Sequence, residues 1–236
     1  MYGTAVIIEP RKLSETEYVI LNYYSCLYNK FKIVFYCGKS HYEYYSNLLW
    51  SVVDVRSLEC DNLKSNEYND FLKQRSFWDS LEGEWVLIFQ SDSWLFDNPR
   101  LDIDYFIDKG YSYIGGNMEY EWVEFDILPK DKVPLIKSFN GGLSLRKRRD
   151  MLQVIESFPP EPTVNYSQRQ DLVSAAEDVY FSLGCILMDK KVGDDVDSLY
   201  FCMHTVYVDR PFGLHSPSHD IKLKLKDILY TIHAKI

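Results

Sequence analysis

The sequence predicts an α/β fold with a mostly parallel central sheet, and three observations carry this prediction. Short apolar runs alternate along the chain with segments whose apolar residues recur at helical spacing, as in strand-helix-strand crossovers. Residues 86–89 are consecutive apolar residues with β-branched and aromatic members, the pattern of a strand covered on both faces. With 236 residues and a hydrophobic fraction of 46%, the chain can form one large core, and we expect a single domain over residues 1–236.

The N-terminal part of the chain supplies most of the expected sheet. A first strand at residues 5–8 ends at residues 9–11, Glu-Pro-Arg, a turn that precedes a helical pattern running to Leu27. The other elements expected here are a strand at residues 31–36, a helix at 42–50, a strand at 52–55 and a helix at 62–78 that leads into the central strand at 86–89.

Residues 90–93, Gln-Ser-Asp-Ser, follow the central strand directly and bring Asp92 to its carboxyl end. Ligands of open α/β sheets bind at this edge. A carboxylate among hydroxyl groups suits a hard cation that carries phosphate. Because Ser and Asp are also ordinary turn residues, the same stretch is equally compatible with a simple turn that Asp92 caps.

Two stretches in the C-terminal part are informative. Gly141 and Gly142 precede an alternating Leu-Ser-Leu segment, so they either allow close approach of a ligand or form a bulge in an edge strand. Glu177 and Asp178 open an apolar helix, where acidic residues also favour the helix dipole. The other expected elements are a helix at residues 102–107, a strand at 113–116, a surface loop or flap at 117–137, a helix at 147–158, an irregular segment at 159–172, a helix at 177–188, a strand at 201–208 and a surface helix at 220–236.

Composition and missing motifs exclude several classes of function. A net charge of −9 with a pI near 5.1 gives no broad basic surface for duplex nucleic acid or an anionic membrane, apart from the short basic run at residues 146–149. Five cysteines without a CxxC pair predict reduced thiols rather than a zinc cluster. There is no signal-peptide pattern and no apolar run of roughly 18 residues, so we expect a cytoplasmic protein without a transmembrane segment. The GxGxxG, GxxxxGK[ST], HExxH and GxSxG motifs are absent.

An ordered set of short blocks carries a resemblance to a known family. The blocks are SFW at residues 76–78, VLIFQSDS at 86–93, FNGGLSLR at 139–146, EDVYF at 177–181 and PFGLH at 211–215. Together they resemble the DUF5672 family of glycosyltransferase-like proteins over most of the chain. The resemblance implies a GT-A fold, which is a three-layer α/β/α sandwich. It also implies a hexosyltransferase that moves a sugar from a nucleotide-diphosphate donor to a hydroxyl of a glycan or glycoprotein acceptor.

The resemblance further implies a Mn²⁺ or Mg²⁺ cofactor and a role for particular residues. Many GT-A enzymes carry Asp-x-Asp after the central strand, whereas this chain has a single carboxylate, Asp92. We expect Asp92 and an exposed His215 to share the cation with the diphosphate, and Asp178 to act as general base of an inverting reaction, with Glu177 as the fallback. The residues expected to bind the donor are Ile8, Glu9, Arg11, Gln90, Ser91, Asp92, Asn140, Gly141 and Gly142.

Two other functions remain open at this point. The missing second aspartate is compatible with a catalytically inactive module that binds a nucleotide sugar or a glycan, and turnover distinguishes this module from an enzyme. A nucleotidyltransferase of similar sheet topology is the second alternative. Such enzymes usually carry a glycine-rich first loop, and residues 9–12 contain no glycine.

Overall fold

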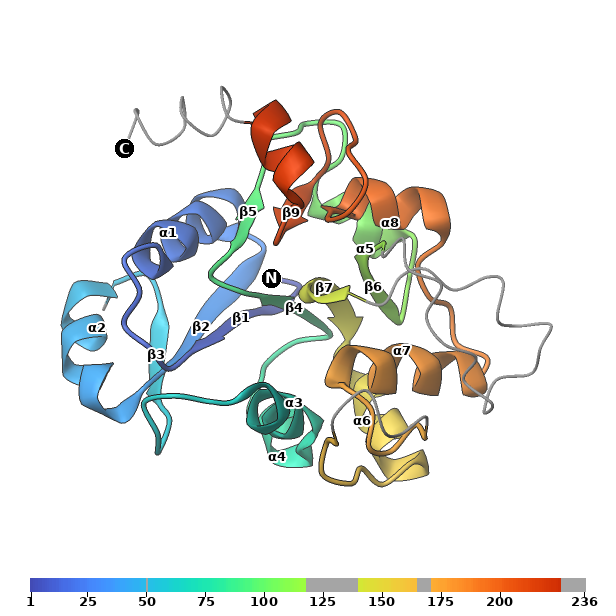
Figure 1. Cartoon of the computed structure of the whole chain (residues 1–236), viewed down its shortest axis with the longest axis horizontal. Helices are drawn as coiled ribbons and strands as arrows, with labels where there is room; N and C mark the ends of the chain where they lie inside the picture. Colours follow the sequence, from blue (N-terminus) through green and yellow to red (C-terminus); the bar gives the residue numbers. More distant parts are fainter. Residues whose placement is uncertain (50, 118–139, 165–170, 226–236) are drawn as a thin grey trace.

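A six-stranded sheet forms the centre of the computed structural model, which describes residues 1–49, 51–117, 140–164 and 171–225 (Figure 1). Within these residues the strand order is β3-β2-β1-β4-β7-β6, and neighbouring strands are parallel except where β7 pairs with β4 and β6. The predicted α/β fold with a mostly parallel sheet is therefore confirmed. The strands are β1 (Gly3–Glu9), β2 (Phe31–Cys37), β3 (Asp54–Ser57), β4 (Trp85–Phe89), β6 (Tyr113–Gly116) and β7 (Asn140–Lys147).

Helices cover both faces of this sheet, as the resemblance to GT-A transferases implies. Because side chains alternate along a strand, Ala5 and Ile7 of β1 join one hydrophobic core, and Val6 and Ile8 join the other. The first core includes residues of α1 (Thr16–Leu27), α2 (Tyr42–Leu49), α5 (Ile103–Asp108) and α8 (Asp195–Phe201). The second includes residues of α3 (Ser65–Lys73), α4 (Arg75–Asp79), α6 (Arg148–Ser157) and α7 (Glu177–Leu187).

A small second sheet extends from the end of β4. Its strand order is β5-β9-β8, with β5 at Ser93–Leu95, β9 at Gly213–His215 and β8 at Cys202–Met203. The pairing of β5 with β9 sets Ser93 opposite His215. This short pairing brings the C-terminal part of the chain to the carboxyl end of the central strand.

The structure differs from the predicted elements in three described regions. The single helix expected at residues 62–78 is two helices, α3 and α4, because the backbone of Gln74 is extended between them. The third strand begins at Asp54, since the N–H groups of Val52 and Val53 donate to the carbonyl of Leu49 at the end of α2.

The strand expected at residues 201–208 is only the two-residue β8, and helix α8 precedes it. The carboxylate of Asp194 begins α8 by accepting the backbone N–H of Asp197, a cap that the apolar pattern does not reveal. The expected flap at 117–137 lies outside the described residues except for Asn117. Of the expected C-terminal helix, residues 220–225 are described and helical.

The sequence also predicts reduced cysteines and no transmembrane segment. All five cysteines are free thiols. In the described ranges, every helix is too short or too polar to cross a lipid bilayer.

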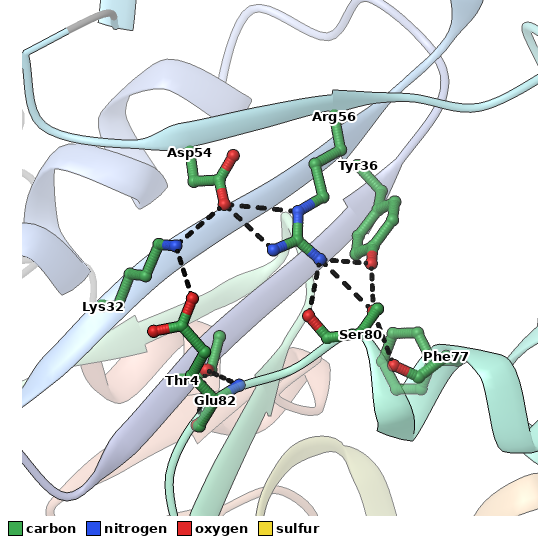
Figure 2. Close-up of polar contacts among 8 residues, drawn as sticks. All are labelled: Thr4, Lys32, Tyr36, Asp54, Arg56, Phe77, Ser80 and Glu82. Carbon is green, nitrogen blue, oxygen red and sulfur yellow. Dashed lines mark hydrogen bonds and ion pairs between the residues drawn. The ribbon is translucent and has the colours of Figure 1, made fainter.

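A polar network ties the edge strand β3 to the segment that follows α4 (Figure 2). The guanidinium of Arg56 donates through Nη2 to Asp54 at 2.9 Å. Through Nη1 it donates to the hydroxyl of Tyr36 at 2.9 Å and to the carbonyl of Ser80 at 3.1 Å. Lys32 of β2 contacts the same Asp54 carboxylate at 3.1 Å. One arginine thus connects two strands to the second helical layer.

We expect Arg56→Met to lower the free energy of unfolding by about 1 kcal/mol, because the hydrogen bonds to Asp54, Tyr36 and Ser80 lose their donor. In a chain of this size the loss corresponds to a melting temperature about 2–4 °C lower, which calorimetry measures. Lys39→Met is the control, since the one ion pair of Lys39 among the described residues is with the exposed Glu59. Equal melting temperatures for the two variants would contradict a stabilising role of the network.

Candidate functional site

A cavity of about 460 Å³ opens at the carboxyl ends of β1 and β4. These two strands are adjacent and parallel, so the segments that follow them meet at one edge of the sheet. The volume lies in the range of small-molecule sites in proteins. Six residues expected to bind the donor line this cavity, namely Ile8, Glu9, Arg11, Gln90, Ser91 and Asp92.

The wall contributed by β1 contains a fixed ion pair. Oε1 of the buried Glu9 accepts hydrogen bonds from the backbone N–H of Arg11 at 3.0 Å and from its Nε at 2.8 Å. Oε2 accepts from Nη2 of Arg11 at 2.8 Å and from the hydroxyl of Ser91 at 3.2 Å. The hydrogen bonds to Glu9 are the largest cause that raises the pKa of Arg11 above its ordinary value. The side chain of Arg11 is 56% exposed and stays charged.

Asp92 lies beside His215, as expected, but His215 is buried in β9 rather than exposed on a loop. The pairing of β9 with β5 explains this burial. Nε2 of His215 is 3.2 Å from Oδ1 of Asp92 and 3.0 Å from Oε1 of Gln90. Burial alone would raise the pKa of Asp92, but the hydrogen bond and charge of His215 hold it below its ordinary value.

The two glycines at the start of β7, Gly141 and Gly142, allow this strand to pack tightly against His215 and Glu177. A Cβ atom at position 142 would lie 2.1 Å from Nε2 of His215, and one at position 141 would lie 2.5 Å from Oε1 of Glu177. The edge-strand alternative does not hold, because β7 lies between β4 and β6. A bulge is nevertheless present, because Gly115 of β6 pairs with Ser144 and the next residue, Gly116, pairs with Asn140. The extra residues of this bulge are Gly141, Gly142 and Leu143 of β7. Gly141 and Gly142 are thus required by close packing at the site.

Glu177, the fallback base, forms a buried ion pair with Arg146. Both nitrogen atoms of the guanidinium fork reach the carboxylate, Nη1 at Oε2 and Nη2 at Oε1, the latter at 3.1 Å. The side chain of Arg146 has 0% exposure and also lies over the rings of Tyr113 and Phe181. The backbone N–H of Glu177 donates to the side-chain carbonyl of Asn69 at 3.1 Å. Helix capping therefore does not account for the Glu177 carboxylate.

Asp178, the expected base, follows Glu177 and lies against β7. Its Oδ2 accepts the backbone N–H of Gly141 at 3.2 Å, and its Oδ1 accepts the N–H of Val179 at 2.8 Å. Burial of the carboxylate is the main cause that raises the pKa of Asp178 to about 7, and the neighbouring Glu177 charge adds to it. The side chain is still partly exposed. Asp178 is therefore an accessible carboxylate poised to exchange a proton near neutral pH.

Tyr68 of α3 also lines the cavity, and it was not among the residues expected at the site. Its hydroxyl is buried and forms no hydrogen bond of ordinary geometry among the described residues, although Gln90 is close enough to lower its pKa. Burial is the main cause that raises its pKa well above the ordinary value, with Glu177 second. The periodicity of α3 marks Tyr68 as apolar, and nothing in that pattern reveals that its polar end reaches the site.

Asp92 and His215, the expected metal ligands, meet one requirement of a bound cation and not another. Oδ1 of Asp92 and Nε2 of His215 are 3.2 Å apart, close to the roughly 3 Å between adjacent ligands of an octahedral Mg²⁺ or Mn²⁺. However, the hydrogen bond of Nε2 to Gln90 requires a proton on Nε2. Metal-bound histidines keep their proton on the other nitrogen and donate it to an acceptor.

Nδ1 of His215 is buried and has no such acceptor among the described residues. The described ranges also contain no group of three acidic, histidine or cysteine side chains placed to hold a metal. His204 contacts the backbone of His215 instead, with Nδ1 2.7 Å from the carbonyl. The described side chains therefore do not fit a resident divalent cation.

Comparisons with known proteins give the following matches. A profile of the family described as "Protein of unknown function (DUF5672)" matches residues 52–215. Among curated proteins, no sequence matches the chain. Similar solved structures include TarS 1-349 of S. aureus, with 16% identity, a TM-score of 0.45 and coverage of 83% of this chain and 58% of TarS.

Two further structures are similar. The mannosyltransferase PcManGT from Pyrobaculum calidifontis, in complex with GDP-Man and Mn²⁺, shares 15% identity with a TM-score of 0.49, over 83% of this chain and 56% of that chain. The 4-diphosphocytidyl-2C-methyl-D-erythritol synthase from Anaerococcus prevotii shares 9% identity with a TM-score of 0.48. The match covers 97% of this chain and 99% of the synthase chain. This chain thus spans little more than half the length of TarS 1-349 and PcManGT.

We expect Glu177→Gln to lower the free energy of unfolding by about 3–5 kcal/mol, because it leaves the Arg146 charge buried without a counter-charge. Urea titration measures the loss. Replacing both residues with Met removes both charges and should cost less than Glu177→Gln alone. Unchanged stability of Glu177→Gln would contradict the ion pair. So would a double Met variant whose loss of stability equals the sum of the losses of its two single Met variants.

Proposed function

The chain belongs to the DUF5672 family, and from this premise and the geometry of the site we propose that it is a glycosyltransferase. The fold is the GT-A type of α/β/α sandwich. The proposed reaction moves a sugar from a nucleotide-diphosphate donor to a hydroxyl of a glycan or glycoprotein. The observation that carries the proposal is a carboxylate of pKa about 7, Asp178, next to Gly141 at the end of the sheet where ligands bind.

The donor is proposed to occupy the cavity at the carboxyl ends of β1 and β4. A charged guanidinium, Arg11, and a buried phenol, Tyr68, line this cavity together with the amide of Gln90. Convergent polar groups of this kind fix the orientation of a bound small molecule. The sugar and the acceptor are proposed to lie over Gly141 and Gly142, next to Asp178.

Asp178 is proposed to act as general base in an inverting transfer. Its carboxylate accepts the proton of the acceptor hydroxyl while that oxygen bonds to the anomeric carbon of the donor. The bond from this carbon to the diphosphate oxygen breaks at the same time, and the nucleoside diphosphate leaves with the electron pair. Glu177 is less suited to this role, because Arg146 already binds both of its oxygen atoms.

The expected Mn²⁺ or Mg²⁺ supplies no step in this proposal. A cation would bring positive charge to the leaving diphosphate, and Asp92 with His215 would be its protein ligands. The described side chains of this pair do not fit a resident ion, as the missing acceptor for Nδ1 of His215 indicates.

The proposal is tested by incubating the protein with uridine, guanosine, adenosine and cytidine diphosphate sugars and following the products by NMR. Water serves as the acceptor where no other is known. Release of a nucleoside diphosphate and a sugar of inverted configuration supports the proposal. A donor that raises the melting temperature without turnover would instead favour the inactive binding module.

We expect Asp178→Asn to retain donor affinity and to lower the rate by about 10²- to 10⁴-fold, since Asn cannot accept the proton. In the wild type only the carboxylate is active, and its pKa is about 7. The wild-type rate should therefore fall about tenfold per pH unit below 7 and level off above it. Steady-state kinetics from pH 5 to 9 check both statements.

Asp220→Asn is the control for this variant, because Asp220 is exposed and is not part of the cavity lining. A wild-type rate in Asp178→Asn, or a rate that is flat between pH 5 and 7, would remove Asp178 from the base role. Loss of donor affinity in proportion to the rate would indicate a binding role instead.

A further inference from the structure

We propose that Arg11, held in a fixed orientation by Glu9, is the group that binds the diphosphate of the donor, and that this binding requires no divalent cation. This inference rests on the proposed function and assigns separate roles to two residues of the first strand end. Glu9 is a positioning residue that does not touch the donor. Arg11 is the anion-binding residue.

Glu9 has no capacity left for a ligand. An ionised carboxylate offers about four acceptor positions. In Glu9 these are taken by the backbone N–H, Nε and Nη2 of Arg11 and by the hydroxyl of Ser91. A ribose or sugar hydroxyl would therefore have to displace one of these donors. The buried carboxylate acts on the guanidinium and on the Ser91 turn, and through them on the shape of the cavity.

Arg11 retains unused donors on the side away from Glu9. A guanidinium carries five N–H donors, and Glu9 takes two of them, one on Nε and one on Nη2. The remaining donors are one on Nη2 and both on Nη1, and no described residue accepts from Nη1. Planar guanidinium groups bind phosphate oxygens with two parallel hydrogen bonds. Because Glu9 already fixes the orientation of Arg11, binding of a phosphate causes a smaller loss of side-chain entropy.

Arg11 is also the only cation among the described residues that line the cavity. The basic run at residues 146–149 begins with Arg146, which has 0% exposure and is neutralised by Glu177. Two acidic residues of the lining, Glu15 and Asp92, would repel a diphosphate if no cation were present. Because the described side chains do not fit a resident metal ion, the N–H donors that Arg11 retains beyond its pair with Glu9 are the available anion-binding groups of this cavity.

The test is calorimetric titration with UDP, GDP, ADP and CDP, each in excess EDTA and each in Mn²⁺. We expect the wild type to bind at least one of them in EDTA, with an affinity that falls as salt is added. Arg11→Met should weaken this affinity about 10- to 100-fold, as expected for a lost charge-assisted hydrogen bond, and remove most of its salt dependence. Glu9→Gln should also weaken the affinity for the nucleoside diphosphate, although Glu9 does not contact the ligand.

Arg210→Met is the matched control, since the side chain of Arg210 is exposed and its ion-pair partner among the described residues is the exposed Asp209. It should bind like the wild type. Wild-type affinity of Arg11→Met in EDTA would overturn the inference. Binding of a nucleoside diphosphate only in Mn²⁺ would also overturn it, while leaving the proposed transferase intact. No binding of any of the four in either condition would contradict the proposed function itself and the inference with it.

Discussion

The buried ion pair between Arg146 and Glu177 is the interaction on which the rest of the site depends. Arg146 lies on β7 and Glu177 opens α7, so the pair joins the antiparallel strand of the sheet to the helix above it. A charge with no exposed surface needs its partner at a fixed distance. This requirement sets the first turn of α7 against Gly141, where the backbone N–H reaches Asp178. The orientation of the proposed base is therefore a consequence of a charge pair in the core.

Ionisation of Asp178 in this arrangement lowers the free energy of unfolding of the protein. Burial and the Glu177 charge raise the pKa of Asp178 to about 7, above the value of an unfolded aspartate. The folded state therefore binds the proton more tightly than the unfolded state does. The contribution of this group to stability is complete at low pH and is lost as the pH rises through 7. Groups that are destabilised in this way are typical of functional sites.

The sequence predicts β1, β2, β4 and β6 of the central sheet well, because apolar runs determine which segments are buried. It places Asp92 and Glu9 at one edge of the sheet for the same reason. It does not predict the short strands of the second sheet. Nor does it predict partners that meet only through the register of the fold, such as Arg146 and Glu177, which are 31 positions apart. Within the basic run at residues 146–149, Arg146 looks like an exposed charge. The burial of His215 likewise depends on the short pairing of β9 with β5.

The most direct test of this account is the ionisation of Asp178 itself, measured apart from any reaction. Carbon-13 NMR of the aspartate side-chain carboxyl groups, with the Asp178→Asn spectrum for assignment, follows this one group from pH 4 to 9. We expect a midpoint near pH 7, because burial beside the Glu177 charge raises the pKa of Asp178. A midpoint near pH 4, the ordinary value for aspartate, would show a well-hydrated carboxylate and contradict the proposed site.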